Sequence, residues 1–152
     1  FVAVEHWNGE CVGCHVTHRG DRYAALEPVA QGLKRHFGGV EAQAARGLSL
    51  RMDHGTQYTS DHFVNQVRYW GIQPSFAFVS EPQTNGVAER FFKTLKEQVI
   101  YGRTFQTVEE VRVAVERFVE RYNREWRFEK NRFISPYEAR ARWVAGSLKA
   151  AA

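Results

Sequence analysis

The segment Met52–Ser60, with the sequence MDHGTQYTS, ends a short apolar run and continues as a tight polar turn. A second segment, Asn85–Phe92 with the sequence NGVAERFF, opens a helix-like stretch. Each segment holds one carboxylate, Asp53 and Glu89, with 35 residues between them. Two carboxylates converging from a strand end and a helix can bind hard divalent cations, which prefer oxygen ligands. The spacing alone favours a plainer interpretation, in which Asp53 caps its turn and Glu89 is an exposed helix acid.

The pattern around these segments indicates an α/β domain. Two strand-like runs, Phe1–His6 and Glu10–Thr17, flank an Asn-Gly pair, which is a strong hairpin signal. The further elements are expected at residues 23–37 (helix), 48–52 (strand), 60–70 (helix), 72–76 (strand), 85–100 (helix), from 107 (helix) and from 135 (helix). Residues 77–85 show no periodicity and predict a mobile loop. This order predicts an α/β sheet covered by helices.

Two capping boxes mark the starts of the last two helices. Thr107 is followed by Glu110, and Ser135 by Glu138, each at the spacing that lets side chain and backbone cap reciprocally. The helix from Thr107 carries an apolar stripe, which predicts a core face. The stripe consists of Val108, Val111, Val115, Phe118, Val119 and Tyr122. The tryptophans are expected in the core or at an interface: Trp7, Trp70, Trp126 and Trp143.

Length, composition and charge limit the classes of protein further. The chain has 152 residues, 43% of them hydrophobic and 25% charged, which suits one globular domain and excludes disorder. No apolar run approaches the roughly 20 residues of a membrane span, so we expect a soluble, cytoplasmic protein. The net charge of +4 belongs to the C-terminal part, because residues 1–85 carry 7 basic and 8 acidic groups. A basic half suits contact with nucleic-acid phosphates.

The segment Cys11–His15 (CVGCH) fits the pattern of c-type haem attachment, and the nearby His18 adds a zinc-like cluster. On a regular strand, however, Cys11 and Cys14 would point to opposite faces, so four ligands could not converge. We therefore expect buried strand thiols rather than a metal or haem site.

The two acidic segments resemble the second and third acidic motifs of the DDE transposases of bacterial insertion sequences, which share the retroviral integrase catalytic core. Three further segments are similar to elements of that family: Gly13 in a strand, Arg121–Asn123 (RYN) and Ser135–Ala139 (SPYEA). The resemblance implies a ribonuclease-H-like mixed sheet flanked by helices, here lacking its first strand. It implies a catalytic core over residues 1–146, N-terminally incomplete, and a tail over residues 147–152.

The resemblance also implies a mechanism. Two Mg²⁺ ions, with Mn²⁺ as a substitute, would support DNA strand cleavage and strand transfer, as in DNA integration. Asp53 would be a ligand of one ion and Glu89 of the second. The partners would be DNA, as transposon ends and target, and further copies of the chain, with no membrane. His54, Lys93 and Lys96 are candidate DNA contacts, although His54 could instead shape its turn and the lysines could form a solvated helix face.

Two departures from the family pattern leave alternatives open. Arg127–Glu129 stands where the family has Arg-Pro-His, and no residue matches the first catalytic Asp of the family. Glu5 falls near the end of a strand but not at the catalytic position. The chain could therefore be a non-catalytic remnant that binds DNA or dimerises, the latter through a free sheet edge. A related ribonuclease-H-like nuclease is disfavoured by the segment Gln57–Ser60 and by the 35-residue spacing.

Overall fold

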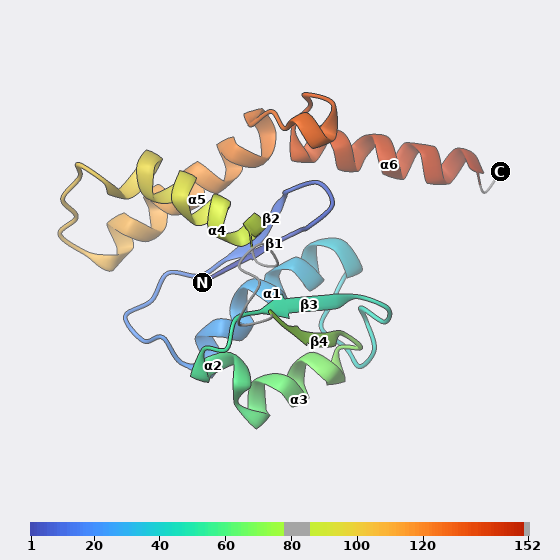
Figure 1. Cartoon of the computed structure of the whole chain (residues 1–152), viewed down its shortest axis with the longest axis horizontal. Helices are drawn as coiled ribbons and strands as arrows, with labels where there is room; N and C mark the ends of the chain where they lie inside the picture. The colour runs from blue at the N-terminus through green and yellow to red at the C-terminus, as the bar shows by residue number, and fades with distance from the viewer. Residues whose placement is uncertain (78–85, 151–152) are drawn as a thin grey trace.

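The computed structural model describes residues 1–77 and 86–150 of the chain (Figure 1). Short strands and helices alternate in the first half, and helices make up the second half. In chain order the elements are β1 (Val2–Val4), β2 (Cys11–Cys14), α1 (Arg22–Phe37), β3 (Ser49–Met52), α2 (Thr56–Thr59), α3 (Asp61–Tyr69), β4 (Gln73–Phe76), α4 (Gly86–Leu95), a π-helical turn η2 (Lys96–Ile100), α5 (Val108–Glu125), a 3₁₀ turn η3 (Glu129–Asn131) and α6 (Pro136–Ala150).

The predicted hairpin is present, with β1 and β2 antiparallel. Its register shifts: Ala3 pairs with Gly13 but Val4 pairs with Cys11, so Val12 is an extra residue in β2. A β-bulge of this kind breaks the alternation of side chains. The prediction that the two cysteines face opposite sides is therefore wrong, because Cys11 and Cys14 both pack against the same hydrophobic cluster.

The strands β3 and β4 form a second, parallel pair, in which Met52 lies opposite Phe76. In the described residues the two pairs are separate two-stranded sheets, so the predicted mixed sheet is present as one antiparallel and one parallel part. A parallel pair needs a crossover, and α2 and α3 supply it. The crossover brings the carboxyl ends of β3 and β4 to the same edge of the sheet.

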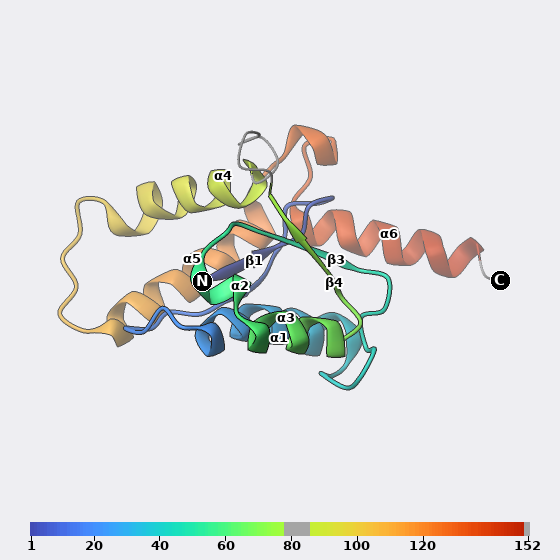
Figure 2. The ribbon, with the colours of Figure 1, turned by 60° about the horizontal axis from the view of Figure 1, so that its bottom comes forward.

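One layer of helices, α1 and α3, covers the β3–β4 pair (Figure 2). Its core contains Leu33 from α1, Met52 from β3 and the fully buried Phe63 and Val67 from α3. α1 begins at the N-cap Asp21, whose carboxylate accepts hydrogen bonds from the Tyr23 and Ala24 amides at 3.0 and 2.9 Å.

The second layer consists of α4, η2 and α5, which lie on the other side of the hairpin (Figures 1 and 2). Phe91 of α4 is buried against Phe118 and Tyr122 of α5, with ring centroids 6.0 and 4.9 Å apart. The predicted apolar stripe of α5 forms this core. Both predicted capping boxes form: the Glu110 amide donates to Thr107 Oγ1 at 3.1 Å, and the Glu138 amide to Ser135 Oγ at 3.2 Å.

Helix α6 leaves the body of the molecule, and residues 141–150 are all exposed (Figure 1). Within the described residues, no helix has both the length and the apolar character needed to cross a membrane.

Most predicted elements are confirmed with shifted ends, and two points differ. The strands of the hairpin are shorter than expected, and the one-turn helix α2 was not foreseen. Trp7 and Trp143 lie outside the core, 45% and 60% exposed and with ring centroids 6.5 Å apart, so for these two the interface stays a prediction. The predicted mobile loop, apart from Ala77, lies outside the described residues.

Candidate active site

Asp53 follows β3 directly, where the strand pairing ends. The backbone amide of Ala77 donates to the Met52 carbonyl at 2.8 Å, which fixes the end of β4 against the end of β3. Asp53 is exposed, and its Oδ1 accepts the Gly55 amide at 2.8 Å. This turn holds the carboxylate in one orientation. Among the described residues, Oδ2 has no hydrogen-bond partner, so Asp53 can still bind a cation through this oxygen.

The turn brings the ends of two flexible side chains close to Gly55, and a larger residue there would displace them. A Cβ added at Gly55 would lie 2.9 Å from Asp53 Oδ1 and 2.5 Å from Gln57 Nε2. Tyr58 lies close enough that the negative charge of Asp53 contributes to a raised pKa of its phenol, after the larger effect of burial. The glycine therefore lets the turn close tightly around an exposed carboxylate.

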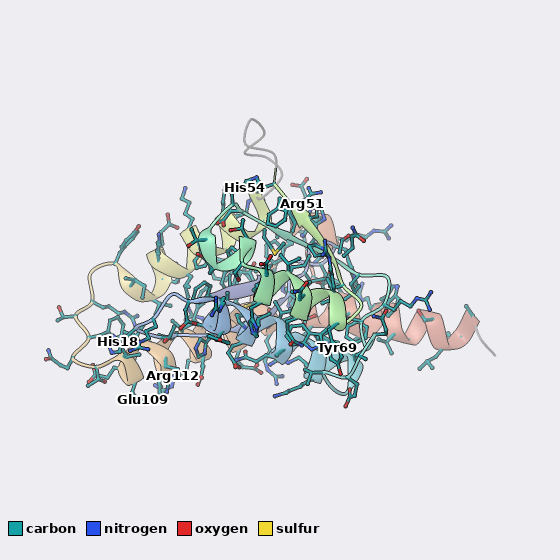
Figure 3. All side chains as sticks on the ribbon, turned by 90° about the horizontal axis from the view of Figure 1, so that it is seen from below. His18, Arg51, His54, Tyr69, Glu109 and Arg112 are labelled. Carbon is teal, nitrogen blue, oxygen red and sulfur yellow. The ribbon has the colours of Figure 1, made fainter. Side chains whose placement is uncertain are left out.

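His54 connects the ends of the two strands. Its Nε2 lies 2.9 Å from the carbonyl oxygen of Ala77, and its ring stacks on Phe76 with centroids 5.4 Å apart. A carbonyl only accepts, so Nε2 carries the proton and donates it. Figure 3 places His54 at the same edge of the molecule as Arg51. This geometry favours the turn-shaping role over a role as a general base; the predicted DNA contact stays a prediction.

Glu89 lies in the first turn of α4 and is exposed. The buried residues Phe91 and Leu95 fix which face of the helix packs inward, so Glu89 and the exposed Lys93 and Lys96 point away from the core. Lys93 Nζ lies 4.0 Å from Glu97 Oε1, an exposed pair of little energetic weight. The predicted lysines are therefore available at the surface, on the same helix face as Glu89.

The fold puts the elements that carry Asp53 and Glu89 on the same side of the molecule. Figures 1 and 2 both place the first turn of α4 on the same side of the molecule as the carboxyl ends of β3 and β4. Within residues 1–77 and 86–150, no group of three or more His, Cys, Asp or Glu side chains could hold a metal ion. The carboxylates of Asp53 and Glu89 are exposed oxygen donors, which fits Mg²⁺ or Mn²⁺.

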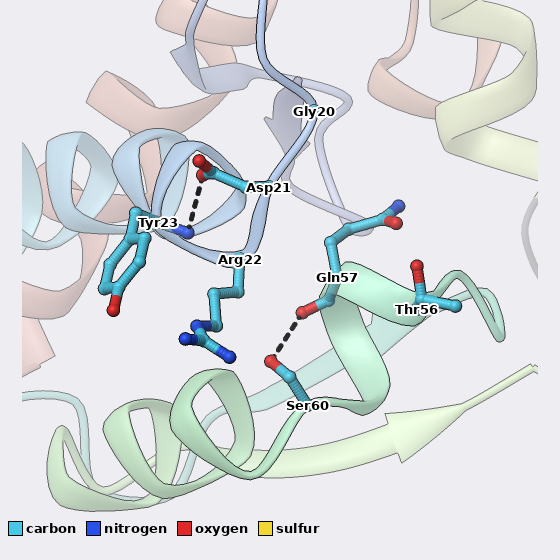
Figure 4. A pocket seen from close by; sticks show the side chains of 7 residues that line it. All are labelled: Gly20, Asp21, Arg22, Tyr23, Thr56, Gln57 and Ser60. Atoms are coloured by element: carbon cyan, nitrogen blue, oxygen red, sulfur yellow. Dashed lines mark hydrogen bonds between the residues drawn. The ribbon is translucent and has the colours of Figure 1, made fainter.

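A polar groove of about 370 Å³ lies beside the Asp53 turn (Figure 4). It separates the start of α1, with Arg22 and Tyr23, from α2, with Thr56 and Gln57. The hydroxyl of Ser60 donates to the Gln57 carbonyl at 3.0 Å, which closes the turn between α2 and α3. Hydroxyl, amide and guanidinium groups therefore line a concave surface next to the candidate site.

The cysteines do not form a site. Cys11 is fully buried, Cys14 is half-buried, and both thiols are free. Burial raises the pKa of the Cys11 thiol, which keeps it protonated and inert. Both cysteines lie in β2, and the prediction of a buried strand thiol is confirmed for Cys11.

Glu5 is held by a structural contact. Its Oε2 lies 3.9 Å from Arg140 Nη2 on α6. The neighbouring Glu10, by contrast, was not singled out from the sequence, although it is fully buried and hydrogen-bonded to His36 at 3.0 Å. A lone acid at the start of a strand gives no sequence signal for such burial, because its partners come from remote helices.

Known proteins are similar to this chain in sequence. Residues 70–141 match the family model described as an integrase core domain. The chain is 34% identical over 76 residues to the transposase for insertion sequence element IS904 of Lactococcus lactis, covering 50% of this chain and 30% of that protein. It is 26% identical over 127 residues to the transposase InsF for insertion sequence IS3A of Escherichia coli, covering 83% of this chain and 42% of that protein.

Solved structures match over more of the chain. The catalytic core domain of BIV integrase superposes with a TM-score of 0.69 at 23% identity, covering 97% of this chain and 88% of that one. A chain of the simian T-cell lymphotropic virus intasome in complex with PP2A regulatory subunit B56 gamma gives a TM-score of 0.62 at 18% identity, covering 84% of this chain and 42% of that one.

These matches show the class of fold, an α/β fold like that of integrase catalytic cores, and residues 70–141 are similar to an integrase core domain. Within this class, the resemblance to the transposases of bacterial insertion sequences is confirmed. The chain spans less than half the length of these two transposases.

Proposed function

We propose that this chain is the catalytic core of a transposase that cuts DNA strands and joins them to new sites. The observation that carries the proposal is the placement of Asp53 and Glu89. Both carboxylates are exposed, and the first turn of α4 lies on the same side of the molecule as the carboxyl ends of the parallel strands. The relatives named as transposases support this activity.

In the proposed reaction, Asp53 and Glu89 hold divalent ions next to a phosphodiester bond. Two Mg²⁺ or Mn²⁺ ions would supply the activation of a water or 3′-hydroxyl and the neutralisation of the leaving 3′ oxygen. The chain positions these groups: the Gly55 amide orients Asp53, and the packing of Phe91 orients the helix that carries Glu89. Lys93 and Lys96 would contact DNA phosphates along the same helix.

A third carboxylate is part of the proposal, and Glu5 is a poor source for it because Arg140 holds its side chain. We place the third acid on a strand that pairs with both β1 and β3. In the described residues each of these strands has one hydrogen-bonded neighbour, β2 and β4 respectively. A strand at this position would join the two sheets into one and would end near Asp53.

The test is a nicking and strand-transfer assay with Mg²⁺ or Mn²⁺, run on the chain and on Asp53→Asn, Glu89→Gln and Asp61→Asn. Asp61 is an exposed acid in the first turn of α3 and serves as the matched control. Mn²⁺ binding, followed by electron paramagnetic resonance, gives a readout that does not depend on turnover. We expect Asp53→Asn and Glu89→Gln, but not Asp61→Asn, to weaken Mn²⁺ binding and to abolish any cleavage. Cleavage that survives both substitutions would overturn the proposal.

The third acid has a separate test. If the 152-residue chain binds Mn²⁺ through Asp53 and Glu89 without cleaving DNA, the assay is repeated on a longer protein with an added strand that carries an Asp. Restored cleavage supports the placement between β1 and β3. A longer protein that has a folded sheet but does not cleave DNA contradicts this placement.

One observation favours a second candidate, a non-catalytic DNA-binding or dimerising protein. No three metal-binding side chains cluster in the part of the chain that the structure describes. DNA binding without any Mn²⁺ binding at Asp53 or Glu89 would favour this candidate over the catalytic one.

A further inference from the structure

The connection between α5 and α6 packs against the same aromatic cluster as α4. Phe128 of this connection has its ring centroid 5.7 Å from that of Tyr122, and Tyr122 lies 4.9 Å from Phe91 of α4. Phe91 is the neighbour of Arg90, which is exposed. The shared cluster therefore fixes the exposed side of residues 128–130 relative to the first half of α4.

Lys130 is anchored at this place. Its ammonium group donates to the backbone carbonyl of His6 at 2.9 Å and lies 5.7 Å from the ring centroid of Phe128. An ammonium has three donors, and this contact uses one of them. The side chain is therefore held in place at its tip while retaining free donors.

Among the residues that the structure describes, Arg90 and Lys130 have no acidic partner. In residues 1–77 and 86–150, neither side chain has a carboxylate oxygen within 4.0 Å, whereas Arg127 is paired with Glu138 at 2.8 Å. The pKa of Lys130 is lowered, first by burial and then by the charge of Arg90, with Glu5 acting in the opposite direction. Two cations that repel each other at a fixed place are stabilised by a bound anion.

We propose that Arg90 and Lys130 form a phosphate-binding site for the backbone of the DNA strand that reaches Glu89. The proposal rests on the proposed function, because it takes the candidate metal site as the place where DNA is cut. A guanidinium and an anchored ammonium both form charge-assisted hydrogen bonds to phosphate oxygens.

The position of Arg90 predicts the direction in which the bound DNA strand runs. Successive helix residues are about 100° apart around the axis, so Arg90 points to a different side of α4 from Glu89 and Lys93. The charge of Arg90 contributes to the lowered pKa of Lys130, and the shared aromatic cluster joins α4 to the connection that carries Lys130, so we place the two cations on neighbouring parts of the surface. A strand held here runs from Glu89 across the hairpin turn towards the connection between α5 and α6, rather than along α4 alone. Lys130 thus supplies the second phosphate contact from 40 residues beyond Arg90 in the chain.

The test measures DNA binding without divalent metal, by fluorescence anisotropy of a labelled duplex over a range of salt concentrations. The variants are Arg90→Gln, Lys130→Gln and the double variant. Arg68→Gln is the matched control, because Arg68 is an exposed cation on α3, in the opposite layer (Figure 2). We expect each of the first two to weaken binding about threefold to tenfold at about 0.1 M salt, equally for unrelated sequences. Each should also reduce the slope of log affinity against log salt by about one.

Two further measurements distinguish the loss of a phosphate contact from a loss of folding. Lys130→Arg should retain most of the affinity, because it keeps the charge; thermal unfolding of every variant shows whether the fold is intact. Affinities and salt slopes of Arg90→Gln and Lys130→Gln equal to those of Arg68→Gln would overturn the proposal. DNA affinity without metal does not depend on cleavage, so it can still be measured when Asp53→Asn removes the metal site. Failure of the phosphate site and failure of the catalytic proposal are therefore distinguishable.

Discussion

The buried carboxylate of Glu10 forms an ion pair with Arg140, which joins the hairpin turn to helix α6. His36 of α1 contacts the other oxygen of the same carboxylate at 3.0 Å. One acid thus ties together a strand, a helix of the first layer and the last helix. The side chain is fully buried, so its charge is compensated by these partners rather than by water.

We predict that Glu10→Gln destabilises the chain by about 3 kcal/mol, because breaking a buried ion pair leaves Arg140 without its main partner. Urea unfolding followed by circular dichroism gives the difference in free energy. Glu5→Gln is the control, since Glu5 is partly exposed and lies 3.9 Å from the same arginine. Glu5→Gln should lower the free energy of unfolding by less than about 1 kcal/mol. Equal losses from both substitutions would contradict the assignment of Glu10 as the main anchor.

The effect of Glu10 should depend on pH. Burial by itself raises the pKa of the Glu10 carboxyl, but hydrogen bonds from His36 and Arg140 outweigh it and hold the pKa below its usual 4.5. The unfolded state therefore binds the proton more tightly, and the carboxylate stabilises the fold at pH above 4.5. This contribution is lost as the pH falls through the lower, folded value. The difference in unfolding free energy between the wild type and Glu10→Gln should shrink between about pH 6 and about pH 3; a constant difference would count against this linkage.

Gly13 is predicted to be irreplaceable in β2. A Cβ at this position would lie 2.0 Å from the carbonyl oxygen of Pro28, a backbone atom of α1 that cannot move aside alone. Gly13→Ala should therefore destabilise the chain by about 3 kcal/mol or more. Gly146→Ala is the control, because no atom lies within 4 Å of its added Cβ and alanine favours the helix. A Gly13→Ala protein with the unfolding midpoint of the wild type would refute the close approach of strand and helix.

Asn123 connects α5 to the hairpin through a pair of backbone hydrogen bonds. Its Oδ1 accepts the Cys11 amide and its Nδ2 donates to the Cys11 carbonyl, both at 2.9 Å, and the side chain is fully buried. Asn123→Ala leaves two buried backbone groups unpaired, so we expect a loss of about 2 to 3 kcal/mol in urea unfolding. Asn65→Ala, on the exposed side of α3, should change stability by less than about 0.5 kcal/mol. If the two variants unfold at the same urea concentration, the hydrogen bonds carry no net stability.

The sequence predicted best what depends on local pattern. The helices α1, α3 and α5 and the two capping boxes follow from periodicity and from side chains three residues apart. The bulge at Val12 was missed because one extra residue in a strand changes no composition or period, yet it reverses the face on which Cys14 lies. The burial of Glu10 was missed for a related reason, since its partner Arg140 is 130 residues away.

The residues of the candidate site could likewise be predicted only where they depend on local sequence pattern. The sequence placed Asp53 at a strand end and Glu89 in a helix, and the structure has both there. The close packing of Lys130 against the hairpin turn could not be foreseen, because it depends on the tertiary contact with His6. Short-range patterns therefore predict which side chains lie at strand ends and in helices, and the tertiary fold decides which of them contact one another.

The last prediction separates the two interpretations of His54. His54→Phe keeps an aromatic ring to stack on Phe76 but removes the donor to the Ala77 carbonyl. If His54 shapes the turn, the variant should lose about 1 kcal/mol of stability in urea unfolding while its DNA affinity without metal stays within about twofold of the wild type. Lys96→Gln is the comparison in the same anisotropy measurement, since an exposed phosphate contact should weaken binding and lower the salt slope. Unchanged stability together with a lower salt slope for His54→Phe would instead identify His54 as a DNA contact.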